Sequence, residues 1–250
     1  MKLSIITVSY NSADTIEFTI KSVLSQKIPD LEYIIIDGGS TDGTLNIIEG
    51  FKKEITVFIS EPDSGIYDAM NKGIRLATGE VIGVLNSDDI YADENVLHDV
   101  MQNFNSDNSL DILFGNLVYV KQNNTDKIVR KWKSQPYFKY FFETGNVPPH
   151  PSLFVTSKVY KQAEPFDLQF NLAADYEFML RIFKKHSFKS KYINRLIVRM
   201  RLGGATNQSI KNILNGNKQI LTAWRNNGLK APITLMPLRI IKRLSQFFLV

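Results

Sequence analysis

The segment near residue 85 reads Gly79-Glu80-Val81-Ile82-Gly83-Val84-Leu85-Asn86-Ser87-Asp88-Asp89-Ile90-Tyr91. Its apolar run from Val81 to Leu85 has the length of a buried strand and is too short for a helix. The run leads into two adjacent carboxylates, Asp88 and Asp89. Ligands of open α/β sheets bind beyond the carboxyl ends of the strands, so we expect both acids to face a cleft.

Two adjacent acids at a strand end are candidate metal ligands. Carboxylate oxygens suit Mg²⁺ or Mn²⁺, and these cations commonly bridge protein carboxylates to substrate phosphates. The alternative is that Asp88 or Asp89 caps the helix expected near Asp93, or supports a turn. The segments that precede this strand favour the metal site.

Strands and helices alternate in the first part of the chain. We expect strands at 3–9, 33–36 and 56–59, with amphipathic helices between them, before the strand at 81–85. This β-α-β-α-β-α-β order predicts an α/β fold with a mixed, mainly parallel sheet flanked by helices. The 250 residues suffice for one large domain with a small appendage, which we expect at 1–228 and 229–250.

The composition excludes some classes of site. The chain has no cysteine, which excludes disulfides and thiolate zinc sites. Its net charge of +5 is compatible with an anionic partner, but the basic residues form no long runs, so nucleic acid is a poor candidate. The start of the chain fits a strand better than a signal peptide, and no apolar segment approaches the ~20 residues of a membrane-spanning helix. We expect a cytoplasmic protein.

Polar side chains also follow the first two expected strands. Thr7, Tyr10 and Asn11 should lie at the edge of the cleft, and this turn has neither of the glycine-rich motifs that bind phosphates. A bound phosphate would therefore need another partner, such as a metal. Asp37 precedes two glycines and is either an acceptor for a base or ribose, or a turn former.

The helix expected at 66–77 carries polar residues along one side. Asp68, Asn71 and Lys72 recur there at helical spacing. They form either a solvated face with an Asp68–Lys72 pair or part of the lining of the cleft. The residues themselves leave both interpretations open.

Four segments combine into a larger pattern: Thr7-Val8-Ser9-Tyr10-Asn11, Asp37-Gly38-Gly39-Ser40-Thr41-Asp42-Gly43-Thr44, Gly65-Ile66-Tyr67-Asp68-Ala69-Met70-Asn71-Lys72-Gly73 and Leu85-Asn86-Ser87-Asp88-Asp89. In this order they resemble the nucleotide-sugar half of family 2 glycosyltransferases of the GT-A fold. The resemblance is strongest to bacterial enzymes of exopolysaccharide and lipopolysaccharide synthesis. It implies a Rossmann-like nucleotide-sugar-binding half at 1–91 and an acceptor half at 92–228.

The resemblance also implies roles for single residues. Thr7, Tyr10, Asn11 and Asp37 would hold the nucleobase, usually uracil. The D-x-D motif of the family falls on Asn86-Ser87-Asp88, so Asp88 would bind the divalent cation and Asn86 would bind the ribose. Asp89 is a second candidate metal ligand, and Asp68, Asn71 and Lys72 are further candidate donor-binding residues.

Two residues of the second half are candidates for the chemistry. His150 lies among Pro148, Pro149 and Pro151. A lone histidine is usually structural, but related enzymes resemble this segment, and His150 would contact the diphosphate or the metal. Asp175 begins an expected helix and by itself fits an N-cap. The family places its catalytic base at this position, which implies that role for Asp175, with Glu177 as the fallback.

The C-terminal residues 238–250 have the pattern of an amphipathic helix. Its apolar side carries Ile240, Ile241, Leu244, Phe247 and Phe248, and its polar side carries Arg239, Lys242, Arg243, Ser245 and Gln246. The helix either docks on the core or lies at a membrane surface. Because enzymes of the resembled family often extend lipid-linked sugars, we expect peripheral binding to anionic lipids on the inner face of the cytoplasmic membrane.

The function that we expect is that of an inverting, metal-dependent glycosyltransferase of the hexosyltransferase type. It would transfer a sugar from a UDP-sugar to a glycan or lipid-linked glycan during cell-surface polysaccharide synthesis. One alternative is a nucleotide-sugar-binding protein without catalysis. Another is a nucleotidyltransferase, which normally has a basic, glycine-rich first loop that 10–13 does not supply.

Overall fold

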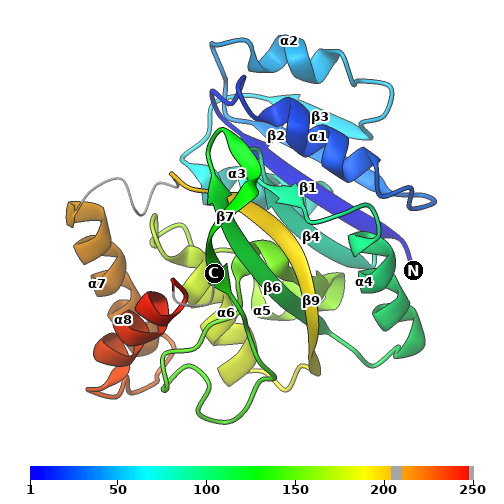
Figure 1. Ribbon diagram of the computed structural model, residues 1–250. Coiled ribbons are helices and arrows are strands. Elements are labelled where there is room, and N and C mark those ends of the chain that lie inside the picture. The colour runs from blue at the N-terminus through cyan, green and yellow to red at the C-terminus, as the bar shows by residue number, and fades with distance from the viewer. Residues whose placement is uncertain (204–209, 248–250) are drawn as a thin grey trace.

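The computed structural model describes residues 1–203 and 210–247. They form a mixed α/β fold around one twisted sheet (Figure 1). The strands are β1 Leu3–Ser9, β2 Glu32–Asp37, β3 Val57–Ser60, β4 Val81–Asn86, β5 Ile90–Tyr91, β6 Ile112–Lys121, β7 Asn124–Trp132, β8 Leu153–Thr156 and β9 Ser190–Arg201. The helices are α1 Ile16–Leu24, α2 Thr44–Glu49, α3 Ile66–Leu76, α4 Val96–Ser106, α5 Ser157–Ala163, α6 Ala174–Lys184, α7 Ile210–Asn226 and α8 Leu235–Ser245, with a short 3₁₀ turn η1 at His150–Ser152.

The sheet has a parallel half and a mixed half. Its strand order is β3-β2-β1-β4-β8-β6-β9-β5, with β7 paired to β6. The pairs β3–β2, β2–β1 and β1–β4 are parallel, as the alternation of strands and helices predicts. Beyond β4 the pairs β4–β8 and β8–β6 are antiparallel, whereas β6–β9 is parallel.

Helices cover both faces of the parallel half because alternate strand residues point to opposite sides. Ile5 of β1 packs with the apolar side of α1 and α4, and Ile6 packs with that of α3. The contact between Ile6 and α3 is close. A Cβ on Gly73 would lie 2.4 Å from Ile6 Cγ2, so only glycine fits there without rearrangement.

The second half contains a long strand, β6, whose pairing with β9 has register shifts after Phe114 and Asn116. It forms an antiparallel hairpin with β7. The hairpin continues the sheet past β8, so the second half of the chain is built on the same sheet.

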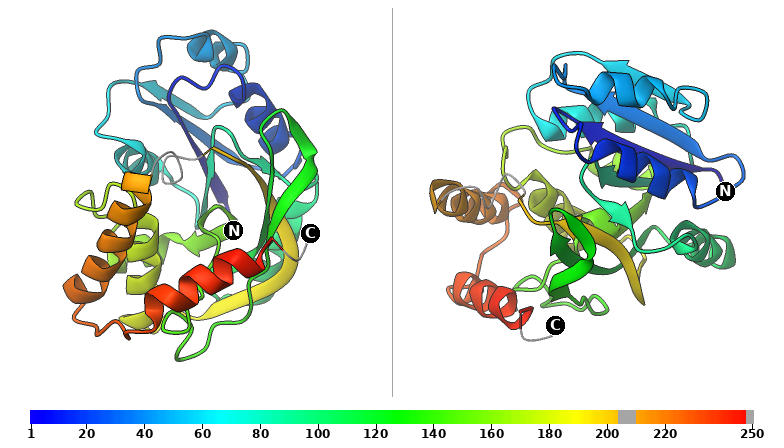
Figure 2. Two further views of the ribbon diagram at one scale, coloured as in Figure 1. Left: turned by 60° about the vertical axis from the view of Figure 1, so that its left-hand side comes forward. Right: turned by 45° about the horizontal axis from the view of Figure 1, so that its top comes forward.

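The C-terminal helices α7 and α8 lie on one side of the molecule, away from α1 and α2 (Figures 1 and 2). Helix α8 begins at Leu235, earlier than the expected residue 238, because Pro237 is tolerated in a first turn, where its missing N–H would have no helical partner. Phe248, expected on the apolar side of this helix, lies outside the described residues. In the described part of the chain, no helix has the length and hydropathy needed to cross a membrane.

Candidate active site

A cavity of about 1790 Å³ opens at the carboxyl ends of β1 and β4, between the two halves of the chain. The beginning of α6 and the inner side of α8 complete its wall. Six of the residues expected to form the site line it: Tyr10, Asn11, Asn86, Asp88, His150 and Asp175. The other six, Thr7, Asp37, Asp68, Asn71, Lys72 and Asp89, are not part of the lining.

The loop after β1 is tied to the loop after β2. Asn11 adopts a left-handed conformation with φ 48°, which asparagine tolerates better than most residues. Its backbone N–H donates to Ser40 Oγ at 2.8 Å, and its Oδ1 accepts from the Thr41 N–H at 2.9 Å. The preceding ring of Tyr10 is 64% exposed at the cavity and therefore accessible to a ligand.

Asp37 and Thr7 lie behind this wall. Asp37 is fully buried and accepts hydrogen bonds from Ser9, Ser60, Gly39 and Ser40. Burial alone would raise its pKa, but these donors, Ser40 foremost, lower the pKa below the usual range. Thr7 is fully buried, and its hydroxyl pairs with that of Tyr33 at 3.1 Å. In this structure Asp37 holds the loop that forms the cavity wall.

The polar side of α3 also serves contacts outside the cavity. Asn71 is buried, and its side chain both donates to the carbonyl of Phe166 and accepts from its N–H, at 2.8 and 3.0 Å. Lys72 Nζ lies 2.8 Å from Glu61 Oε1 and 3.9 Å from Asp68 Oδ2. The polar side of 66–77 therefore makes half-buried contacts to the loop at 61–64 and one buried pair of hydrogen bonds to the second half of the chain.

The turn after β4 separates its two acids. Asp88 is half-buried and lines the cavity, and burial raises its pKa. Asp89 is fully buried, and its pKa is raised well above the usual range by burial and by the charge of Asp88. Thr19 Oγ1 donates to the carbonyls of Ser87 and Asp89 at 2.9 and 2.8 Å, which fixes this turn.

The oxygen atoms around Asp88 are suitable ligands for a divalent cation that also binds a substrate. Asn86 Oδ1 and Asp89 Oδ1 are buried without a hydrogen-bond partner, so oxygen atoms beside Asp88 have unused acceptor capacity. No group of three His, Asp or Glu side chains gathers within residues 1–203 and 210–247 in a way that would hold a metal alone. The expected set of Asp88, Asp89 and His150 is therefore not a preformed three-ligand site. Mg²⁺ and Mn²⁺ commonly use one or two carboxylates together with substrate phosphates.

His150 lies on the side of the cavity near Asp175. It begins η1, and its ring meets that of Phe166 edge-on at 5.5 Å between centroids. Burial lowers its pKa, while the charge of Asp175 acts in the opposite direction. A neutral imidazole at neutral pH can accept a hydrogen bond or bind a metal.

Asp175 occupies the first turn of α6 and lines the cavity. The hydroxyl of Tyr67, on α3, donates to its Oδ1 at 3.0 Å. Burial and the charge of Asp175 raise the pKa of Tyr67 well above its usual value, so the phenol keeps its proton and remains a donor. Sequence analysis did not identify Tyr67, because its partner lies on a helix of the other half of the chain.

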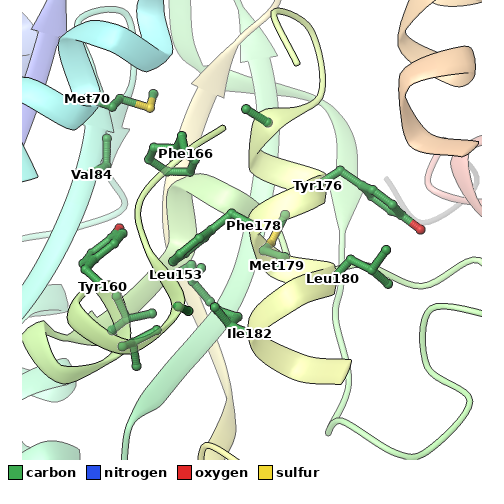
Figure 3. Packing of buried hydrophobic residues seen from close by; sticks show 14 of the residues in the cluster. Met70, Val84, Leu153, Tyr160, Phe166, Tyr176, Phe178, Met179, Leu180 and Ile182 are labelled. Carbon is green, nitrogen blue, oxygen red and sulfur yellow. The ribbon is translucent and has the colours of Figure 1, made fainter. Parts of the chain in front are cut away.

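Glu177, the fallback for the base, is not available to a substrate. It is buried and accepts hydrogen bonds from Arg181 Nε and Nη2, each at 2.8 Å, and from Asn227 at 3.0 Å. Tyr176 and Phe178 of α6 point in different directions, and both are buried in the same hydrophobic cluster (Figure 3). Asp175 is thus the acid of this helix that reaches the cavity.

Comparisons with known proteins identify the family of this chain. Residues 4–160 match the family model described as Glycosyl transferase family 2. The chain is 33% identical over 184 residues to an uncharacterised glycosyltransferase of Mycobacterium tuberculosis, covering 72% of this chain and 68% of the relative. The protein therefore belongs to glycosyltransferase family 2.

Solved structures share the fold at low sequence identity. TarS from S. aureus in complex with UDP-GlcNAc superposes with a TM-score of 0.68 and 18% identity, covering 97% of this chain and 79% of that one. A mannosyltransferase from Pyrobaculum calidifontis, in complex with GDP-Man and Mn²⁺, superposes with a TM-score of 0.61 and 17% identity, covering 97% and 74%. These matches confirm the expected GT-A-like fold.

Proposed function

We propose that this glycosyltransferase is an inverting, metal-dependent enzyme that uses a UDP-sugar and glycosylates a saccharide acceptor. The observation that carries the proposal is that Asp88 and Asp175 line one cavity from opposite halves of the chain. Asp88 follows the strand β4 of the nucleotide-binding half, and Asp175 begins a helix of the other half. Asp88 can then act on the leaving group through a bound cation, while Asp175 accepts the proton of the attacking hydroxyl.

The donor would bind at the loops after β1, β2 and β4. The exposed Tyr10 ring offers a stacking surface for a base, and Gly38 lines the same wall. A Cβ on Gly38 would lie 2.6 Å from Asp63 Oδ2, so a side chain would crowd this part of the cavity. UDP is the preferred nucleotide because TarS, which shares the fold, was solved with UDP-GlcNAc.

Asp88 would hold the divalent cation together with phosphate oxygens of the donor. The cation would supply the positive charge that stabilises a departing nucleoside diphosphate. Mn²⁺ is the first choice to test, because the mannosyltransferase of the same fold was solved with Mn²⁺. Asn86 is next to the ribose in this arrangement, and His150 is available as a neutral acceptor on the far wall.

Asp175 would act as the general base. It would take the proton from an acceptor hydroxyl as that oxygen attacks the anomeric carbon from the face opposite the diphosphate. The new glycosidic bond forms as the bond to the diphosphate breaks, and this single displacement inverts the anomeric centre. The hydrogen bond from Tyr67 orients the carboxylate for this task.

The acceptor would be a glycan or a lipid-linked glycan, processed by an enzyme held peripherally at an anionic membrane surface. The support is the outer side of α8. Ile241 and Leu244 are 60% and 56% exposed and lie outside the cavity lining, whereas Lys242 and Arg243 of the same helix line the cavity. Exposed apolar residues beside cations are typical of helices that lie in the interface of anionic bilayers.

A donor screen tests the proposed function. The purified protein is incubated with UDP-, GDP- and dTDP-sugars, with and without Mn²⁺, and the released nucleotide is measured. We expect Mn²⁺-dependent hydrolysis of a UDP-sugar. Binding without release of UDP under all conditions, including added saccharide acceptors, would favour a non-catalytic binding protein. Release of inorganic pyrophosphate from UTP and a sugar phosphate would indicate a nucleotidyltransferase.

A further inference from the structure

The charges that line the cavity are segregated between its two walls. Among the described residues, the wall built from residues 8–88 contributes four carboxylates and no lysine or arginine; the carboxylates are those of Asp14, Asp42, Asp63 and Asp88. The described part of the wall from residue 119 onward contributes five cations and a single carboxylate, that of Asp175. These cations are Arg130, Lys133, Arg239, Lys242 and Arg243. The acceptor side is therefore strongly positive.

Arg130 is a buried guanidinium that lacks an anionic partner. It lies on β7 and is 5% exposed, and its Nε has no hydrogen-bond partner within the described chain. Its guanidinium carbon lies 3.6 Å from the centroid of the Tyr119 ring, which covers one face. None of the ion pairs among the described residues includes Arg130. A buried cation of this kind is costly unless it is paired, so it points to a ligand.

Arg239 is a second, half-buried guanidinium beside the proposed base, and the charge of Asp175 acts to raise its pKa against the larger effect of burial. Its guanidinium carbon lies 4.6 Å from the centroid of Tyr176, the residue that follows Asp175, and the ion pairs of the described chain do not include it either. Burial, and to a smaller extent the charge of Arg243, lowers the pKa of both Arg239 and Arg130. An anion bound beside Arg243 would offset its repulsion of both Arg130 and Arg239.

Two backbone contacts hold the cationic side of α8 against the cavity. The N–H of Lys131 donates to the carbonyl of Gln246 at 3.1 Å, which joins β7 to the end of α8. At the other end, a Cβ on Gly145 would lie 2.8 Å from the backbone nitrogen of Arg239, so α8 packs directly on this glycine. The helix thus turns its cations toward the cavity together with Met236 and Ile240, while Ile241 and Leu244 stay exposed outside it.

We infer that Arg130 and Arg239 form a phosphate-binding subsite for the acceptor, so that the acceptor carries a phosphate ester close to the hydroxyl that is glycosylated. The inference rests on the proposed function, because it uses Asp175 as the group that receives the acceptor hydroxyl. Guanidinium groups bind phosphate oxygens through paired N–H donors, and aromatic rings stacked on their faces leave the edges free for such contacts. Trp132, which lines the same wall, can pack on the apolar face of an acceptor sugar.

The diphosphate of the sugar donor is the other anion that these arginines could bind. Its expected position differs from that of the acceptor phosphate. On the donor wall, Asp88 would hold the cation that binds the diphosphate, whereas Arg239 stacks on the residue next to the proposed base. A group held at Arg239 is therefore on the side from which the acceptor attacks.

Titration calorimetry of the full-length protein, saturated with UDP and Mg²⁺, tests the subsite. The probes are glycerol 1-phosphate, farnesyl diphosphate and glucuronic acid. We expect the phosphate probes to bind the wild type. Arg130→Gln and Arg239→Gln should each weaken this binding by about tenfold or more, the size of one charge-assisted hydrogen bond. Arg225→Gln is the matched control, since Arg225 is exposed on α7, bonds only locally to Thr222 and lies outside the cavity.

The UDP affinity of each variant separates this inference from the proposed function. It should stay within about twofold of the wild type, which also shows that each variant is folded. The subsite is refuted if the wild type binds no phosphate probe, if glucuronic acid binds instead, or if Arg225→Gln loses as much affinity. An equal loss of UDP affinity in the arginine variants would assign the two residues to the donor and overturn the inference, while the proposed function would stand. Preference for farnesyl diphosphate over glycerol 1-phosphate would identify a lipid carrier as the source of the phosphate; equal binding would identify a phosphorylated saccharide.

Discussion

The phenol of Tyr67 donates a 3.0 Å hydrogen bond to Oδ1 of Asp175, across 108 residues of sequence. The bond joins α3 in the first half of the chain to the first turn of α6 in the second half. It fixes the direction of the carboxylate that we propose as the base, and the raised pKa of Tyr67 keeps the donor protonated. Two predictions address this pair.

Asp175→Asn should reduce kcat by roughly 10²–10⁴, because the amide keeps the shape of the side chain but cannot accept a proton. UDP affinity should be retained, since Asp175 is not part of the donor wall. Steady-state kinetics and UDP titration measure both quantities. A variant with normal kcat and poor donor affinity would show that Asp175 binds the donor instead.

The neighbouring acid provides a matched control. Glu177→Gln removes a buried partner of Arg181, so we expect a loss of roughly 1–3 kcal/mol in the free energy of unfolding with little change in kcat of the folded fraction. A large loss of kcat in folded Glu177→Gln would reassign the base to Glu177.

Tyr67→Phe should lower kcat by about tenfold, the size of one hydrogen bond to a charged group, without changing UDP affinity. The hydroxyl does not contact the donor in our proposal, so its loss should act only through the orientation of Asp175. The combined variant with Asp175→Asn provides the check, because Tyr67→Phe should have little further effect once the base is gone. Additive losses would mean that Tyr67 acts independently of Asp175.

Asp88→Asn should abolish divalent-dependent turnover while the thermal unfolding temperature remains near that of the wild type, because a half-buried acid at a strand end contributes little to stability. Activity across a Mn²⁺ titration is the measurement. Asp14→Asn removes an exposed acid of the same wall and should leave the metal dependence in place. Unchanged metal dependence in Asp88→Asn would remove Asp88 from the mechanism.

The lowered pKa of Glu32 predicts how the free energy of unfolding depends on pH. Burial alone would raise its pKa, but hydrogen bonds from Ser4, Thr78 and Lys2 lower the pKa to about 2, from 4.5 for a free glutamate. Because the folded-state pKa is the lower one, its contribution is complete above pH 4.5 and is lost as the pH falls toward 2. The shift corresponds to about 3 kcal/mol.

Urea unfolding of the wild type and of Glu32→Gln between pH 7 and 3 measures this contribution. Glu32→Gln should be less stable at pH 7 and should lose less stability on acidification than the wild type. The exposed Glu49→Gln, whose partner Lys52 is also at the surface, should behave as the wild type does. Parallel curves for Glu32→Gln and the wild type would contradict the assignment.

The outer side of α8 predicts peripheral binding to anionic membranes. The pair Ile241→Glu and Leu244→Glu changes exposed residues outside the cavity lining, so it should reduce sedimentation with anionic liposomes and spare UDP affinity. This design is sharper than truncation after Ala231, which would also remove Arg239 from the cavity wall. Added salt should weaken the binding of the wild type.

Phe18→Glu supplies the control for α8. Phe18 is 57% exposed on α1, which lies on the other side of the molecule from α8 (Figures 1 and 2). Equal sedimentation of the wild type and the α8 variant would show that the exposed apolar residues of α8 do not bind the membrane.

The sequence by itself determined the parallel half of the fold. Buried strands such as β4, helices with one apolar side such as α3, and their alternation are local patterns, and local periodicity predicts the faces of an element well. The order of the motifs likewise placed Asp88 after a strand and Asp175 at the start of a helix. The family match and the shared GT-A-like fold agree with that prediction.

Only the tertiary structure decided which polar side chains reach the cavity. Asp88 lines it and the adjacent Asp89 is buried, while Asp37 holds a loop from behind the wall. These outcomes depend on the turn of the backbone and on neighbours that are distant in sequence, and no periodic pattern encodes them. The same reason applies to the contact of Tyr67 with Asp175 and to α8, whose cations line the cavity because Gly145 and β7 anchor its backbone there.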